Sequence, residues 1–214
     1  MQAKTITPKT QELFEKLNDD VITISWKWQI IRSLYGTQER VDLLSATAPS
    51  FFQVCQSTFA DDVFLMLSRI TDSPKTRGQE NLVIARLIDS IDANQDPAFH
   101  QKLKQMADAA ILACLPFRKH RHKRLAHSDL SFKLQTAGNL IPNISVDEIN
   151  RAVEALQNVL NEFNRHFLDR ETSYKVIENG GVKALVTYLQ KGVDAFEAEK
   201  RQALAAHSAT RKST

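Results

Sequence analysis

Apolar residues recur every three or four positions along most of this chain, which is the period of an amphipathic α-helix. The clearest case runs from Val146 to Phe167, where apolar residues follow at alternating spacings of three and four. Similar patterns predict further helices over residues 8–34, 38–46, 49–70, 80–92, 97–126 and 182–206. No segment shows the convincing alternation of a half-buried strand. The pattern therefore predicts an all-α protein, a single-domain bundle of about six or seven helices. This domain is expected to cover residues 1–206, followed by a flexible C-terminal tail over residues 207–214.

Local signals mark several boundaries of these helices. Ser145 followed by Glu148 is a capping box, in which each residue bonds to the other at the first helical turn. Pro116 lies inside the fifth predicted helix. Because a proline removes one hydrogen bond and clashes with the preceding turn, we expect a kink or a break near Leu115. Residues 71–78 and 131–143 contain Gly, Pro, Ser or Asn and are predicted to be loops.

Composition limits the classes of protein that this chain can belong to. Apolar residues make up 43% and charged residues 25%, which is an ordinary balance for a soluble globular protein. The longest apolar run covers residues 109–115, whereas a membrane span needs about 20 residues, so we expect no membrane association. Cys55 and Cys114 both lie in apolar helical pattern, which favours small buried side chains over a disulfide or a zinc site. A reducing cytoplasm is the expected location.

One segment departs from this ordinary pattern. The net charge is only +3, yet five of the seven residues from 118 to 124 (RKHRHKR) are Lys or Arg. A cluster of this kind concentrates positive potential and attracts phosphate. Three of the six histidines, His120, His122 and His127, lie in or just after the cluster. The plain alternative is a solvated helix face that binds nothing.

The cluster also resembles a known motif. Arg121, the polar His122, four further residues and then His127 are similar to the Arg–polar–x–His signature of the HEPN superfamily, the higher eukaryotes and prokaryotes nucleotide-binding domains. The phrases at residues 124–129 (RLAHSD) and 67–72 (LSRITD) resemble the U-type abortive-infection branch of that superfamily. The resemblance implies a HEPN-like helical domain that dimerises and brings two copies of the motif to a shared cleft. It also implies metal-independent RNA cleavage in the active members, although many HEPN domains are inert binding modules.

The residue types of the motif suit this chemistry. Cleavage without a metal uses the ribose 2′-hydroxyl as nucleophile, and it needs a proton acceptor, a proton donor and positive charge at the phosphorus centre. His127 is the candidate general acid/base because a histidine titrates near neutral pH. Arg121 is the candidate that stabilises the phosphorane, because a guanidinium stays charged and presents a planar donor fork. Candidate supporting residues are His122, Arg124 and Asp129, and candidate phosphate-binding residues are Arg118, Lys119 and Lys123.

Helix geometry leaves two arrangements open. In an unbroken helix, a separation of six residues places Arg121 and His127 about 120° apart, whereas His120, Arg124 and His127 share one face. Either Arg121 reaches around from the stretch after Pro116, or the cleft combines an Arg and a His from two subunits. Arg124 therefore remains an alternative to Arg121 for contact with the scissile phosphate. Asp72 can pair with a motif Arg, although capping of the loop after the third helix is the favoured role.

The sequence thus favours a HEPN endoribonuclease of the toxin or phage-defence type. The first alternative is a non-catalytic HEPN dimer that binds nucleic acid, nucleotide or a protein partner, and the second is a plain helical interaction module. Expected partners are RNA, a second copy of the chain and an antitoxin protein. We expect no cofactor. We also expect no metal, because only His120 and His127 share a face, about 10 Å apart along the axis, and the nearby cations repel a divalent ion.

Overall fold

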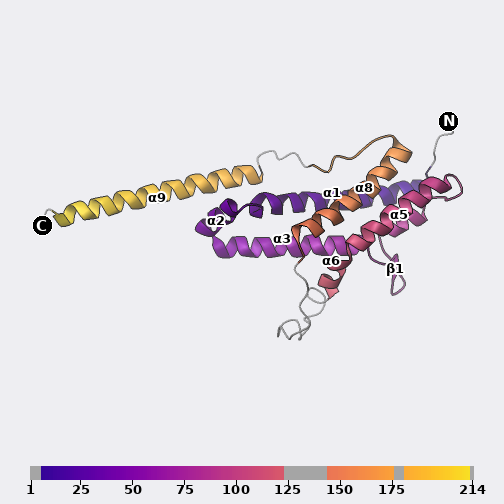
Figure 1. Ribbon diagram of the computed structural model, residues 1–214, viewed down its shortest axis with the longest axis horizontal. Coiled ribbons are helices and arrows are strands. Elements are labelled where there is room, and N and C mark those ends of the chain that lie inside the picture. The colour runs from indigo at the N-terminus through magenta and orange to yellow at the C-terminus, as the bar shows by residue number, and fades with distance from the viewer. Residues whose placement is uncertain (1–5, 123–143, 176–180, 213–214) are drawn as a thin grey trace. The chain divides into compact units, whose positions relative to one another are not determined.

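The computed structural model describes residues 6–122, 144–175 and 181–212, with side chains up to residue 207 (Figure 1). The described part is all-α apart from one small hairpin, as the sequence predicts. It contains eight helices: α1 (Pro8–Tyr35), α2 (Gln38–Thr47), α3 (Pro49–Ile70), α4 (Ile84–Asp89), α5 (Pro97–Ala113), α6 (Leu115–His120), α8 (Val146–Leu168) and α9 (Val182–Lys212). None of the helices in these ranges is long and apolar enough to span a membrane.

The chain divides into two compact units. The first comprises residues 1–28 and 60–176, and the second comprises residues 29–59 and 177–214. Helices α1 and α3 each contribute one part to either unit. The extent of a single domain over residues 1–206 stays a prediction.

The first unit has a core built on α8, which packs along α5. The capping box at the start of α8 is present: Ser145 Oγ accepts a hydrogen bond from Glu148 N at 3.2 Å, and Ser145 N donates to Glu148 Oε2 at 2.8 Å. Further along α8, the buried ring of Phe163 stacks on that of Phe14 in α1, with the ring centres 4.6 Å apart. The apolar stripe predicted for residues 146–167 is therefore the face that closes this core, except at Val146, which is 54% exposed.

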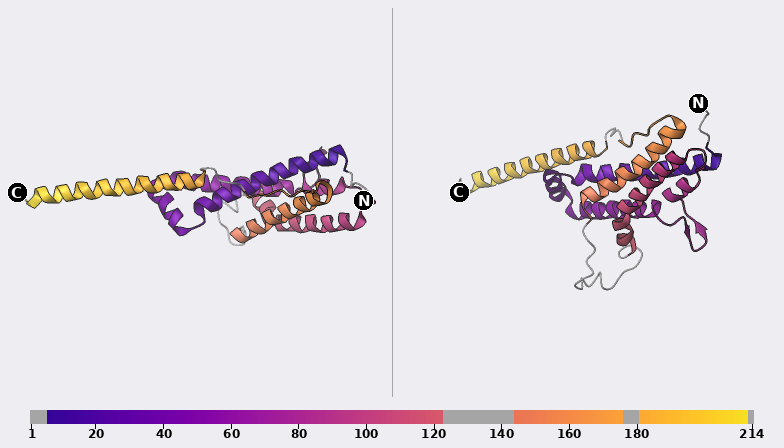
Figure 2. Two further views of the ribbon diagram at one scale, coloured as in Figure 1. Left: turned by 90° about the horizontal axis from the view of Figure 1, so that it is seen from above. Right: turned by 45° about the vertical axis from the view of Figure 1, so that its right-hand side comes forward.

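The predicted break at Pro116 is confirmed. Helix α5 ends at Ala113 and α6 begins at Leu115, so that Cys114 ends one helix and caps the next. Phe117 anchors the short α6, since it is fully buried and its ring lies 5.3 Å from that of Phe64 in α3. Helix α6 consequently leaves in a different direction from α5 (Figure 2). This division of the fifth predicted helix brings the number of helices in the described residues to eight.

The predicted loop at residues 71–78 contains a hairpin instead. Strand β1 (Lys75–Thr76) pairs antiparallel with β2 (Gln79–Glu80), and the turn between them is Arg77-Gly78. The helix predicted from residue 80 begins only at Ile84, because Asn81 is tied back to the hairpin by hydrogen bonds from its Nδ2 to Ser73 O and Thr76 Oγ1. Leu82, inside the predicted helix, therefore precedes α4, and its side chain is 38% exposed.

The second unit has a small core of its own. Leu34, Leu44 and Phe52 are buried in it. The first turns of α9 pack against this cluster through Val182, Val186 and Leu189. Helix α9 then continues to Lys212, beyond the end at Ala206 that its apolar pattern predicted.

Candidate functional site

The candidate site centres on one carboxylate shared by two guanidiniums. Arg121 Nη1 donates a hydrogen bond to Asp72 Oδ2 at 2.7 Å, and Arg118 Nη2 lies 3.4 Å from Asp72 Oδ1. All three side chains are between 25% and 30% exposed. One negative charge therefore faces two positive charges, and the three groups together keep a net charge of about +1.

The local fold explains why these three residues meet. Because α6 is a separate helix, Arg118 and Arg121 lie three positions apart at its end and project to the same side. Asp72 lies two residues beyond the end of α3 at Ile70, and its backbone N–H bonds to Arg69 O in the last turn of that helix at 3.1 Å. The sequence favoured a loop-capping role for the Asp72 side chain. The structure instead shows the other role considered, the pairing with a motif Arg.

His120 occupies a different environment from its neighbours. Its side chain is only 8% exposed, and its Nε2 lies 3.3 Å from Asp61 Oδ1 on α3. The ring also packs edge-to-face against Phe64, with the ring centres 5.1 Å apart. Asp61 was not singled out from the sequence, and the pair fixes α6 against α3. The same turn of α6 thus has an interior histidine and, on the other side, exposed or half-exposed cations.

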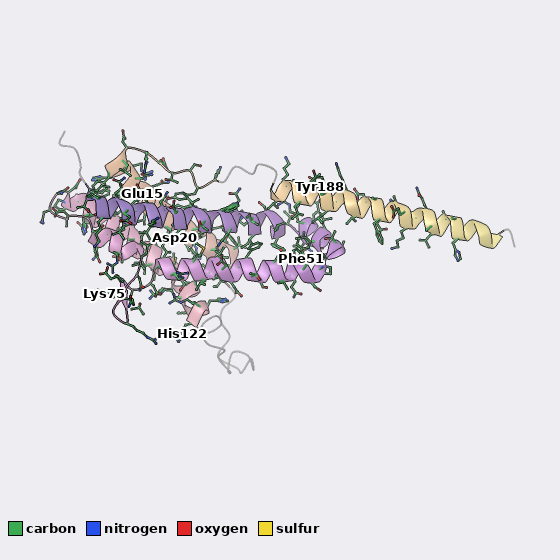
Figure 3. The ribbon with its side chains drawn as sticks, turned by 180° about the vertical axis from the view of Figure 1, so that it is seen from behind. Glu15, Asp20, Phe51, Lys75, His122 and Tyr188 are labelled. Atoms are coloured by element: carbon green, nitrogen blue, oxygen red, sulfur yellow. The ribbon has the colours of Figure 1, made fainter. Side chains whose placement is uncertain are left out.

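The predicted site residues fall into two groups. Arg118, Lys119, Arg121 and His122 lie in the described part at the end of α6. Lys119 and His122 are exposed there, and Figure 3 labels His122 at the tip. The others lie outside the described residues: Lys123, Arg124, His127 and Asp129. The roles assigned to both groups stay predictions.

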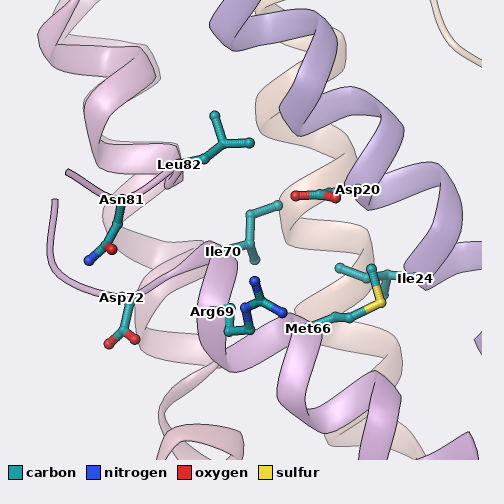
Figure 4. A pocket seen from close by; sticks show the side chains of 8 residues that line it. All are labelled: Asp20, Ile24, Met66, Arg69, Ile70, Asp72, Asn81 and Leu82. Carbon is teal, nitrogen blue, oxygen red and sulfur yellow. The ribbon is translucent and has the colours of Figure 1, made fainter. Parts of the chain in front are cut away.

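A pocket of about 240 Å³ lies beside Asp72. Its polar lining consists of Asp20, Arg69, Asp72 and Asn81, and the Asp72 carboxylate points away from Asp20 (Figure 4). Burial raises the pKa of Asp20, an effect that the positive charge of Arg69 opposes and the negative charge of Asp19 reinforces. Asp72 therefore contributes to the pocket wall while its carboxylate holds the cations of α6.

A nucleophilic thiol and a metal site are two further chemistries that the described residues of this region do not support. Cys114 lies at the α5–α6 junction, where burial raises the pKa of its thiol to about 12 despite a hydrogen bond with Thr71 and the charge of Arg118. A thiol that stays protonated is a poor nucleophile. Within the described ranges, no three or more His, Cys, Asp or Glu side chains gather as a metal site would require.

The class of protein defined so far is an all-α domain with a cluster of cations at the end of the short helix α6, where a carboxylate from the segment after α3 anchors them. The family model HEPN_AbiU2, described as AbiU2, matches residues 7–185, and the chain belongs to this family. The resemblance to the abortive-infection branch of HEPN proteins is thereby confirmed, and the chain has a HEPN-type domain. Neither the curated proteins nor the solved structures gave a match.

Proposed function

We propose that this protein is a metal-independent HEPN endoribonuclease of the toxin or phage-defence type. The observation that carries the proposal is the single carboxylate of Asp72 between Arg118 and Arg121. It holds the motif arginine in place and leaves an excess of positive charge. A guanidinium has five N–H donors, so a bond to one carboxylate oxygen uses only part of its capacity to bind phosphate.

The proposed reaction assigns one role to each motif residue. The ribose 2′-oxygen attacks the adjacent phosphorus, the bond from phosphorus to the 5′-oxygen breaks, and a 2′,3′-cyclic phosphate forms. As general acid/base, His127 takes the proton of the 2′-hydroxyl and returns a proton to the leaving 5′-oxygen, which contributes roughly 10²–10⁴-fold to such a reaction. Arg121 stabilises the additional negative charge on the phosphorane, and loss of such a preorganised donor costs roughly 3–4 kcal/mol.

We also propose that the protein acts as a homodimer, in which the two motifs share a cleft. The proposed substrate is RNA, and an antitoxin protein is the proposed inhibitory partner. The support for these partners is membership of the HEPN family together with the net positive charge at the end of α6. Lys119 and His122 are exposed at that end, where a polyanion can reach them.

The proposal is tested by incubating the purified full chain with RNA in the presence of EDTA. We expect cleavage that yields 2′,3′-cyclic phosphate ends, because neither the nucleophile nor the proton transfer requires a metal. His127→Ala should lower the cleavage rate at least 100-fold, since general acid–base catalysis contributes about 10²–10⁴-fold. The matched control is His207→Ala, which removes an exposed histidine from α9 and should leave the rate unchanged.

Three outcomes would contradict the proposal. Equal rates for the His127→Ala protein and the wild type would show that His127 is not the acid/base. Cleavage abolished by EDTA would mean that a metal is required. Binding of RNA without cleavage by the wild type would instead support the non-catalytic HEPN dimer.

A further inference from the structure

The hairpin at residues 75–80 presents two exposed cations on a rigid base. Lys75 and Arg77 are both exposed, while Glu80 is paired with Arg86, whose Nη1 lies 3.0 Å from Glu80 Oε2. Arg86 also donates from Nη2 to Pro74 O at 2.7 Å and from Nε to Asn81 O at 2.9 Å. Arg86 thus neutralises Glu80, the acidic residue of the hairpin, while the positive charges of Lys75 and Arg77 remain exposed.

Arg77 holds a backbone conformation that its residue type disfavours. Its φ of +49° lies in the left-handed region, and Gly78 follows at +82°. A two-residue turn with both angles positive usually has Asn, Asp or Gly at its first position. A long cation at that position is strained, and strain of this kind is concentrated at functional sites. Turn geometry alone would favour Asn at this position, so the presence of Arg77 points to a function of its positive charge.

The hairpin lies next to the candidate site. Lys75 is only three residues after Asp72, which holds Arg118 and Arg121. Both the hairpin and the end of α6 project from the same side of the first unit, as the labels of Lys75 and His122 show, while Glu15 of α1 lies on the opposite side (Figure 3). A polyanion bound at the end of α6 would pass close to these two cations.

The composition of the hairpin indicates which kind of macromolecule would bind there. Residues 75–80 (KTRGQE) include no apolar side chain. The buried core of a protein–protein interface is apolar and rich in aromatic residues. Interfaces with nucleic acid are polar and positively charged. The hairpin therefore fits a phosphate backbone better than it fits a protein partner.

We propose that the hairpin is a second RNA-backbone contact, in which Lys75 and Arg77 each bind a phosphate of the strand whose cleavage is proposed at the end of α6. This inference rests on the proposed function for its substrate. Phosphate contacts position a strand without reading its sequence. The hairpin should accordingly strengthen binding by a similar factor for any single-stranded RNA.

The test measures binding of single-stranded RNA that is 2′-O-methylated, so that it lacks the nucleophile and cannot be cleaved. The full-length double variant Lys75→Gln/Arg77→Asn is compared with Lys9→Gln/Lys16→Gln, which removes two exposed cations of α1. Each phosphate contact on a single strand contributes about 0.7 to the slope of log affinity against log salt. The hairpin variant should lower that slope by about 1.4 and weaken binding on the order of tenfold at 0.1 M salt. The α1 variant should leave the slope close to that of the wild type.

The outcomes separate this inference from the proposed function. Asn adopts positive φ more readily than Arg, so the hairpin variant should keep the thermal midpoint of the wild type, and weaker binding would not reflect unfolding. If the two double variants share the wild-type slope, or if the wild type binds no RNA, the hairpin contact is refuted. Absence of cleavage with ordinary RNA would refute the ribonuclease, and the slope would still decide the role of the hairpin.

Discussion

Asp72 offers a way to separate positioning from charge neutralisation. Its carboxylate holds Arg121 at 2.7 Å, and this restrains the guanidinium before any substrate arrives. A group that must meet a transition state within a fraction of an ångström gains from such restraint. The same carboxylate also cancels positive charge, which on its own would weaken the binding of RNA. The two effects act on different kinetic constants.

We predict that Asp72→Asn lowers kcat for RNA cleavage by about 10- to 100-fold while KM stays the same or falls, because the arginine loses its anchor and the site gains net positive charge. The matched control is Asp62→Asn, on α3, which breaks the ion pair with Lys27 and should leave both constants unchanged. Initial-rate kinetics on the two variants provide the measurement. An unchanged kcat together with a lower KM for Asp72→Asn would mean that the carboxylate only neutralises charge.

Pairs such as Asp72–Arg121 and Asp61–His120 mark the limit of what a single sequence predicts about this site. Their members are 49 and 59 positions apart, and no periodicity connects them. The motif itself was visible because it is short and lies in one basic run. The partner of Arg121 was considered in the sequence and assigned another role, since a residue just after a helix usually caps it. Only the packing of α6 on α3 decides between the two.

Whole elements were predicted where their signals are local. The capping box of α8 needs only Ser145 and Glu148, and the end of α5 needs only Pro116. The hairpin escaped prediction because each of its strands has two residues, too few to show alternation. The start of α4 at Ile84 was not predicted either, because it depends on the hydrogen bonds from Asn81 Nδ2 to Ser73 O and Thr76 Oγ1.

At the level of one element, we predict that Ser145→Ala lowers the free energy of unfolding of the whole chain by about 1 kcal/mol, because the hydroxyl satisfies a backbone N–H at the start of α8. Urea unfolding followed by circular dichroism measures the loss. Ser57→Ala, which removes an exposed hydroxyl within α3, should change the same quantity by less than about 0.5 kcal/mol. Equal losses in the two variants would show that the cap contributes nothing specific.

The same cap makes a pH-dependent contribution. Hydrogen bonds from the backbone N–H and the hydroxyl of Ser145 lower the pKa of Glu148 from its ordinary value of 4.5. Because the folded state binds this proton less tightly than the unfolded state, the contribution of the carboxylate is complete above pH 4.5 and is lost as the pH falls through the lowered pKa. The stability difference between the wild type and Glu148→Gln should therefore shrink on acidification. A constant difference from neutral pH down to acid would contradict this account.

For the whole molecule, the candidate chemistry belongs to one of the two compact units. The first unit contains the end of α6, Asp72 and the hairpin, whereas the second contains α2 and α9. The family match over residues 7–185 covers nearly all of the first unit and also residues 29–59 and 177–185 of the second, and it ends one turn into α9. The sequence predicted the helical content because amphipathic periods are local. The division into two units depends on contacts between distant segments, which those periods do not record.

The final prediction concerns how a whole dimer assembles its site. Arg121 and His127 are six residues apart, and the sequence allows either a site within one chain or a site that takes one residue from each subunit. These arrangements differ when Arg121→Ala and His127→Ala proteins are mixed and allowed to exchange subunits. In a shared cleft, each mixed dimer has one cleft with both residues intact and one with neither. Random exchange should then restore about one quarter of the wild-type activity, since half of the dimers are mixed and half of their sites are complete.

The control for this mixing experiment uses the double variant Arg121→Ala/His127→Ala. Mixed with either single variant, it leaves every cleft without one of the two residues, so these mixtures should remain as inactive as their parents. Activity is followed as release of cyclic phosphate ends in EDTA, and subunit exchange is verified with differently tagged chains. If the two single variants exchange subunits and remain inactive, the arginine and the histidine act within one chain. The end of α6 would then have to turn Arg121 and His127 toward the same phosphate, against the 120° or so that a regular helix puts between them.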